Sequence, residues 1–147
     1  MSLYIGIDPG ASGGIAILGA GSPIAYAMPA TERDTADILS VYERDGLEGF
    51  AFAAIENVHS MPRQGVASSF KFGRSYGFLR GLLIAYGIPF TEVTPAVWQR
   101  AMKCLTHGDK NISKARAQQL FPQIKVTHAV ADALLIATYC RDGKGRG

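Results

Sequence analysis

The sequence predicts an α/β fold, in which helices flank a five-stranded mixed sheet. Five short, mostly apolar runs have the length and composition of strands, at residues 3–7, 15–18, 24–28, 50–55 and 88–93. After the third run, strands alternate with longer segments of helical pattern, an order typical of a sheet covered by helices. We find no internal repeat and no linker. Residues 1–142 are therefore expected to form one domain, and residues 143–147 a flexible tail.

The first three strands are expected at the start of the chain. The first run ends in the carboxylate of Asp8, and the Pro-Gly pair that follows turns the backbone sharply. Residues 19–23 form a hairpin-type connection between the second and third strands. Either Thr31 or Asp34 then caps a helix that ends near Gly46.

Helices dominate the rest of the chain. The fourth run also ends in a carboxylate, Glu56, and a long helix is expected over residues 66–86. After the fifth strand, Pro95 opens a short helix. A basic loop precedes the last two helices, expected at residues 113–121 and 128–139.

Charge is distributed unevenly along the chain, although the net charge is only +3. Residues 1–56 hold two basic and eight acidic residues, a balance of −6, and residues 57–147 hold thirteen basic and four acidic residues, a balance of +9. A basic second part suggests a polyanionic partner, with nucleic acid first in line. Solvated surface lysines and arginines would give the same count.

The composition argues against two broad classes of protein. With 48% hydrophobic and 18% charged residues, the chain is not expected to be disordered. No apolar stretch reaches the roughly 18 residues that a membrane span needs. Cys104 and Cys140 are too few for a disulfide framework, and the N-terminus lacks the layout of a signal peptide, so we expect a cytoplasmic protein.

Three carboxylates, Asp8, Glu56 and Asp132, stand among apolar residues, where an uncompensated charge is costly. Adjacent strands could bring the first two side by side, and a helix could lay Asp132 over them. Like charges that close raise each other's pKa, and a divalent cation removes the conflict. Hard carboxylate oxygens suit Mg²⁺ or Mn²⁺, and two such ions can clamp the oxygens of a phosphodiester. Each carboxylate alone could instead be a turn, cap or surface residue.

Two histidines lie close to these carboxylates in the sequence. His128 precedes Asp132 by one helical turn, so it could bind or position a metal-bound water, contact a phosphate, or simply face solvent. His59 follows Glu56 in a loop, where it could touch DNA or be an ordinary surface residue.

The long helix carries Gly73, Gly77 and Gly81 on one stripe, which lets another backbone approach closely. That backbone could be the protein's own sheet or the same helix of a second copy. Basic residues, on this helix and elsewhere, could face DNA phosphates or solvent. They are Arg63, Lys71, Arg74, Lys103, Lys110, Lys114 and Arg116.

Several segments form an ordered set of motifs: IGIDPG at 5–10, IENV at 55–58, FGRSYG at 72–77, SKARAQ at 113–118 and ADALLIA at 131–137. Together they resemble the motifs of RuvC-type Holliday-junction resolvases, which belong to the RNase H-like superfamily. The short chain and the TPAVW segment at 94–98 look more like phage-type relatives, which can accept several branched DNAs.

The resemblance implies an RNase H-like fold and specific roles for the candidate residues. Asp8 would bridge two Mg²⁺ ions, for which Mn²⁺ could substitute, and Glu56 and Asp132 would complete the site. His128 would bind the second metal or orient the attacking water, and Lys114 would stabilise charge on the phosphate. His128 is the stand-in for an acid or histidine that the family usually carries at the position of Ala129, and His59 stands where bacterial members often have a DNA-contacting aromatic residue.

The sequence therefore predicts an Mg²⁺-dependent endonuclease that cuts Holliday junctions, and other branched DNA, by paired nicks from a homodimer. Three alternatives stay open: an RNase H-like nuclease that acts on RNA or RNA–DNA hybrids, a nucleotide-phosphate-binding module, and a DNA-binding scaffold without catalysis.

Overall fold

The computed structural model describes residues 2–44, 46, 49–57 and 64–145. Its helices and strands follow the predicted order along the chain. They are β1 (Ser2–Asp8), β2 (Gly14–Leu18), β3 (Ile24–Ala27), α1 (Glu32–Ser40), β4 (Phe50–Glu56), α2 (Val66–Ala85), β5 (Phe90–Val93), α3 (Pro95–Ala101), α4 (Lys110–Leu120) and α5 (His128–Gly145).

The strands form one sheet in the order β3-β2-β1-β4-β5. The pairs β1–β2 and β2–β3 are antiparallel, whereas β1–β4 and β4–β5 are parallel. Antiparallel neighbours are joined by short turns, and the parallel strands by helical crossovers, as their connections require. The predicted fold class, a five-stranded mixed sheet flanked by helices, is confirmed.

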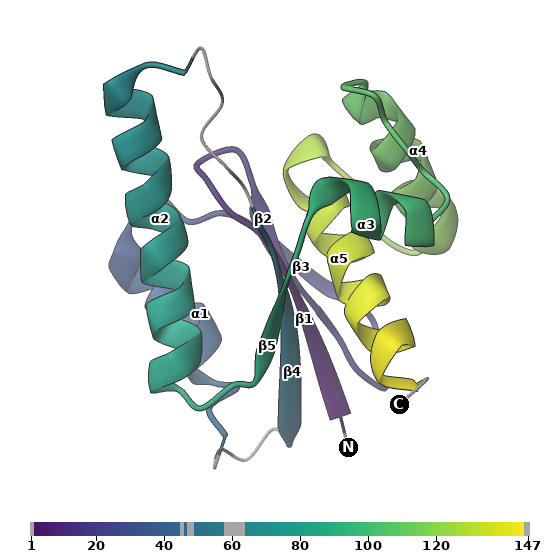
Figure 1. The fold of residues 1–147 in the computed structure, drawn as a ribbon. Coiled ribbons are helices and arrows are strands. Elements are labelled where there is room, and N and C mark those ends of the chain that lie inside the picture. The colour runs from purple at the N-terminus through teal and green to yellow at the C-terminus, as the bar shows by residue number, and fades with distance from the viewer. Residues whose placement is uncertain (1, 45, 47–48, 58–63, 146–147) are drawn as a thin grey trace.

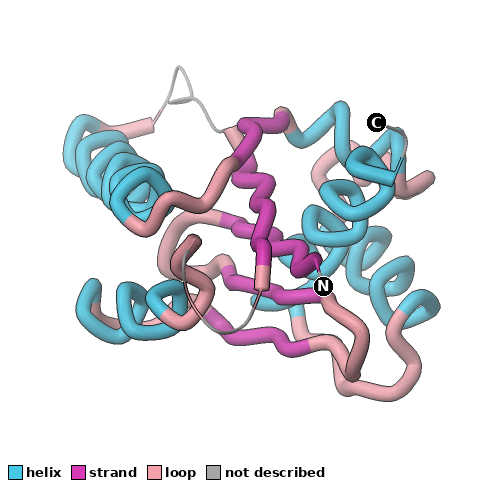
Figure 2. Tube along the Cα trace, turned by 90° about the horizontal axis from the view of Figure 1, so that it is seen from below, coloured by secondary structure: helices cyan, strands magenta, loops and turns pink. Residues whose placement is uncertain are grey.

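Helices cover both faces of the sheet, as Figure 1 and the view from below in Figure 2 show. α1 and α2 lie on one face, and α3, α4 and α5 lie on the other. Among the described residues, no helix is long and apolar enough to span a membrane.

Strand alternation decides which residues meet which helix layer. Ile5 and Ile7 of β1 pack in one core cluster with Leu79 of α2, whereas Ala54 of β4 packs with Leu134 of α5 in the other. Odd-numbered positions of β1 thus face α2. Even-numbered positions of β1 face α5, and so do even-numbered positions of β4.

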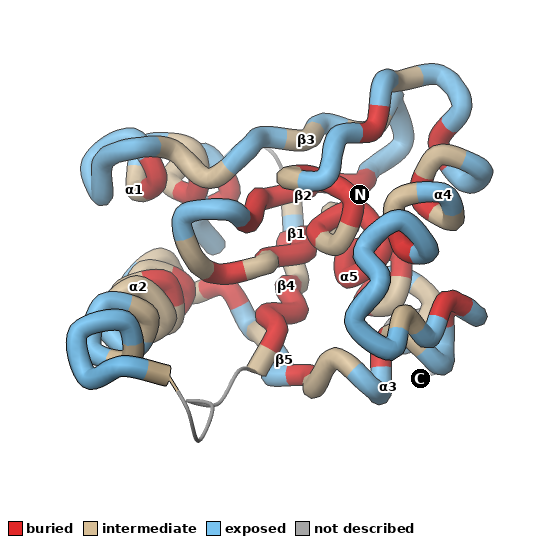
Figure 3. The backbone as a smooth tube through the Cα atoms, turned by 90° about the horizontal axis from the view of Figure 1, so that it is seen from above, coloured by how far each residue is buried: buried red, intermediate tan, exposed pale blue. Residues whose placement is uncertain are grey.

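Gly6 lets α5 lie directly on β1. A Cβ atom at Gly6 would overlap the backbone of Ala133 and Ala137, so no other residue fits there without a shift of the helix. α5 is accordingly the most enclosed of the helices in Figure 3, and Ala133 to Ala137 are fully buried. This close contact brings the start of α5 to the edge of the sheet where β1 ends.

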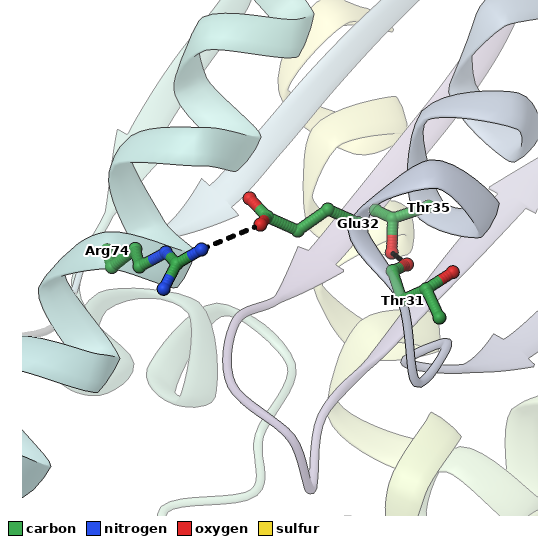
Figure 4. Close-up of polar contacts among 4 residues, drawn as sticks. All are labelled: Thr31, Glu32, Thr35 and Arg74. Atoms are coloured by element: carbon green, nitrogen blue, oxygen red, sulfur yellow. Dashed lines mark hydrogen bonds and ion pairs between the residues drawn. The ribbon is translucent and has the colours of Figure 1, made fainter.

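α1 is capped by Thr31, one of the two residues predicted for that role. Its side chain accepts a hydrogen bond from the Asp34 backbone N–H at 3.1 Å, and Thr35 Oγ1 donates to the Thr31 carbonyl oxygen at 3.2 Å. Arg74 of α2 pairs with Glu32 of α1 at 3.2 Å, which links the two helices on this face (Figure 4).

Some element boundaries differ from the prediction. α1 ends before the predicted limit near Gly46. α4 begins at Lys110, within the predicted loop, because the Asp109 side chain caps it. α5 continues past Tyr139 to Gly145, so residues 143–145, predicted as tail, lie within the helix.

Candidate active site

Asp8 and Glu56 end neighbouring parallel strands on the same face of the sheet. Ile7 of β1 pairs with Ile55 of β4, so the next residue of each strand, Asp8 and Glu56, continues the same register. Both occupy even-numbered positions, which face α5. Glu56 is buried and Asp8 is half-buried. The backbone therefore brings these two carboxylates to neighbouring strand ends, as the sequence predicted.

Asp132 comes to the same edge from the second turn of α5. Burial raises the pKa of Asp132, while a hydrogen bond from the Ser113 hydroxyl and the charges of Lys110 and His128 lower it. The interaction with His128 agrees with their spacing of one helical turn. His128 itself is exposed at the start of α5.

The three carboxylates interact electrostatically. Burial raises the pKa of Asp8 to about 8, and repulsion from Glu56 and Asp132 contributes to the rise. Burial also raises the pKa of Glu56, and repulsion from Asp132 adds to it, whereas a hydrogen bond from Trp98 lowers it. Buried acids whose ionisation is opposed by neighbouring carboxylates, as for Asp8 and Glu56, favour a bound cation.

Lys110 is the lysine whose charge acts on all three carboxylates, since it lowers the pKa of each one. It is exposed on the first turn of α4, one turn before Lys114. The sequence assigned Lys110 only a contact with DNA and assigned the phosphate-stabilising role to Lys114. In the described part of the chain, Lys110 rather than Lys114 is thus the lysine whose charge affects the pKa of all three carboxylates.

Trp98 and Ser113 were missed as site residues. Trp98 Nε1 donates to Glu56 Oε2 at 2.7 Å, and the Trp98 side chain is fully buried. Ser113 is also buried, and its hydroxyl has two acceptors within reach, the Lys110 carbonyl oxygen at 3.2 Å and the Asp132 carboxylate. The sequence signal for Trp98 was weak: it is the only tryptophan of the chain.

The donors suit a hard divalent cation such as Mg²⁺ in charge and in chemistry, because they are carboxylate oxygens that repel one another. Within the described ranges, however, no three His, Cys, Asp or Glu side chains converge closely enough to hold a metal ion as they stand. The fit therefore rests on the chemistry and the electrostatics of the donor set.

The predicted DNA contacts are scattered. Lys71 and Arg74 line a cavity of about 490 Å³ beside α2, and α2 covers the sheet face opposite the carboxylates. Lys103 and Lys110 are exposed, Lys103 between two residues of the core cluster that contains α5 and Lys110 at the start of α4. Arg116 donates to the Met102 carbonyl oxygen at 2.9 Å and to Gln119. His59 and Arg63 lie outside the described residues.

The glycine stripe of α2 does not pack against the sheet. A Cβ atom at Gly73, Gly77 or Gly81 would meet nothing within 4 Å. Val66 and Phe70 of the same helix are 88% and 72% exposed. The interpretation that the stripe serves packing on the protein's own sheet is therefore wrong, because these glycines face open space.

Solved structures share this fold. T. thermophilus RuvC in complex with a Holliday junction substrate aligns with a TM-score of 0.65 at 16% identity, over 96% of this chain and 96% of that chain. A second Thermus thermophilus RuvC structure aligns with a TM-score of 0.59 at 18% identity, again over 96% of both chains. The sequence matches no protein-family model and no curated protein. The chain thus has the RNase H-like fold of RuvC, as the motifs predicted.

Proposed function

We propose that this chain is a divalent-metal-dependent DNA endonuclease that resolves Holliday junctions, and accepts related branched DNA, as a homodimer. One observation carries the proposal: Asp8 and Glu56 end adjacent parallel strands, and Asp132 of α5 is close enough for its charge to raise the pKa of both. The fold shared with a protein solved on a Holliday junction supports the same conclusion.

Asp8, Glu56 and Asp132 would hold the metal. Bound Mg²⁺ would supply Lewis acidity toward the phosphodiester and toward water. The chain itself contributes rigid placement, since Asp8 and Glu56 stand on strand ends rather than on a free loop. It also contributes a low-dielectric setting, in which these charges act strongly.

Lys110 and His128 are the basic groups next to the carboxylates. We assign Lys110 to the phosphate, where its ammonium would offset negative charge in the transition state. His128, exposed one turn from Asp132, would orient the attacking water or bind the second ion. The role predicted for Lys114 stays a prediction that its own variant can test.

A homodimer would supply two sites for the paired nicks. The stripe of Gly73, Gly77 and Gly81 lies open on α2, with Phe70 exposed on the same helix, so α2 is the surface we assign to the second copy. Small residues there would let two copies of the helix approach closely. Substituting Gly77 with leucine should weaken the dimer in sedimentation velocity runs, and an unchanged dimer would point to another surface.

Cleavage of a panel of substrates tests this function. End-labelled four-way junction, flap, RNA–DNA hybrid and linear duplex are each incubated with wild type and with Asp8→Asn in Mg²⁺. We expect paired nicks near the crossover of the junction with wild type and none with Asp8→Asn. Preferential cleavage of the hybrid would indicate a nuclease that acts on RNA–DNA hybrids instead. Cleavage of none of the substrates would refute the proposed nuclease activity.

A further inference from the structure

Trp98 makes a buried contact with Glu56 that the proposed metal site does not explain, because Trp98 is not one of the proposed ligands. Trp98 lies in the first turn of α3, and its Nε1 donates to Glu56 Oε2 at 2.7 Å. The tryptophan is 0% exposed and the glutamate 8% exposed. An indole N–H can only donate, so when it is buried it needs an acceptor. Here that acceptor is a carboxylate of the proposed site rather than a backbone carbonyl.

Both partners are fixed by the structure around them. Trp98 packs in the core cluster with Ala54 and Met102, so its ring is enclosed. Its backbone N–H donates to the Thr94 carbonyl oxygen, and its own carbonyl oxygen accepts from the Met102 N–H at 2.9 Å. On the other side, Glu56 is the last residue of β4, which pairs with β5 through Val93. The indole therefore cannot follow the carboxylate if Glu56 rotates.

We propose that Trp98 is a positioning residue that holds Glu56 Oε2 and so turns Oε1 toward a divalent cation. This inference rests on the proposed function, since Glu56 is a metal ligand only there. Bidentate binding would have to compete with the indole for Oε2, so the hydrogen bond favours monodentate coordination by Glu56. Mg²⁺ and Mn²⁺ accept such ligands readily, whereas Ca²⁺ commonly takes both oxygens of a carboxylate. Trp98 would thereby fix the position of Glu56 and favour Mg²⁺ or Mn²⁺ over Ca²⁺.

A buried tryptophan with a purely structural role would give a different result on substitution. Its loss would loosen the core and weaken the binding of every cation alike. A positioning role instead predicts a change in the ratio of affinities. Trp98→Phe keeps an aromatic ring but removes the N–H, and Met102→Leu, in the same cluster, is a matched packing control that leaves the hydrogen bond in place.

Calorimetric titration of the full chain with Mn²⁺ and with Ca²⁺ tests the proposal. Outer-shell partners of metal ligands typically contribute 10–100-fold to metal affinity. We expect Trp98→Phe to weaken Mn²⁺ binding by roughly tenfold and Ca²⁺ binding by less than about twofold. Met102→Leu should change neither. Equal losses for both ions, an unchanged Mn²⁺ affinity, or no Mn²⁺ binding by wild type would each overturn the proposal.

A measurement on wild type decides the question even if Trp98→Phe does not fold. Trp98 is the only tryptophan of the chain, so its indole N–H gives a single resonance in a ¹⁵N-labelled sample. Adding Mg²⁺ should shift that resonance as Glu56 binds the ion. A stationary resonance, in a sample that calorimetry shows to be saturated with Mg²⁺, would refute the role of Trp98. Junction cleavage is scored separately, so failure of the proposed function and failure of this inference give different results.

Discussion

Replacing Asp8 with asparagine should stabilise the protein when no divalent metal is present. Burial raises the pKa of Asp8 from 3.8 to about 8, and Glu56 and Asp132 add to the rise. In the unfolded chain the carboxyl ionises near its ordinary value. The folded chain therefore binds more protons than the unfolded chain between about pH 4 and pH 8, and the stability of wild type falls as the pH rises through that interval.

The size of the effect follows from this pKa difference. Each pKa unit corresponds to about 1.4 kcal/mol, so the penalty above pH 8 has a ceiling of roughly 6 kcal/mol. A half-buried asparagine amide that lacks a partner costs about 1–3 kcal/mol in return. We expect a net gain of about 3 kcal/mol for Asp8→Asn, which raises Tm by roughly 6–12 °C in a domain of this size.

Scanning calorimetry in EDTA at pH 5 and at pH 9 measures the difference. Tm of Asp8→Asn should exceed that of wild type at pH 9, and the gap should shrink at pH 5. Asp37→Asn, at an exposed position of α1, is the control for the same chemical change and should leave Tm unaltered at both pH values. Saturating Mg²⁺ at pH 9 should stabilise wild type and reduce the difference in Tm between wild type and Asp8→Asn. Equal Tm values for wild type and Asp8→Asn at pH 9 would refute the electrostatic argument.

Three further predictions concern single side chains. Lys110→Met should slow single-turnover cleavage of a junction by roughly 100-fold, because its charge acts on all three carboxylates. Lys114→Met should slow cleavage less, and the reverse order would assign the phosphate-stabilising role to Lys114. Gly6→Ala should lower the free energy of unfolding in urea by about 3 kcal/mol or more, since its Cβ would overlap the α5 backbone, and a near-native value would contradict that packing. Arg74→Ala should change the same free energy by less than about 1 kcal/mol, because its ion pair with Glu32 is exposed, and a larger loss would mean that the pair links α1 and α2 more strongly.

The sequence predicted the carboxylate pair because its signal is local. An apolar run that ends in an acid predicts a carboxylate at a strand end, and both Asp8 and Glu56 fit that pattern. Gly6 and the small residues of α5 are also visible in the sequence. Their contact with each other becomes evident only when the helix is placed on the strand. The order of the strands in the sheet was not predictable, because an apolar run does not determine which other strand it pairs with.

Trp98 and Lys110 could not be found in this way, because their interactions are tertiary. The hydrogen bond between Trp98 and Glu56 joins residues 42 positions apart, which no local pattern encodes. Lys110 was taken as part of a loop because the cap at Asp109 was not recognised, so the lysine was placed off the helix that carries it. The glycine stripe was ambiguous for a different reason. Small residues permit a close contact, but they do not determine whether the partner is the protein's own sheet or a second copy of the helix.

Cutting of a supercoiled plasmid that extrudes a cruciform tests the central claim most directly. Two nicks placed in one binding event give linear plasmid, whereas one nick gives a relaxed circle. We predict linear product from wild type in Mg²⁺, and intact supercoiled plasmid with Asp8→Asn or in EDTA. A supercoiled plasmid that wild type leaves uncut, or converts only to relaxed circles, would contradict the assignment of this carboxylate site to paired cleavage of branched DNA.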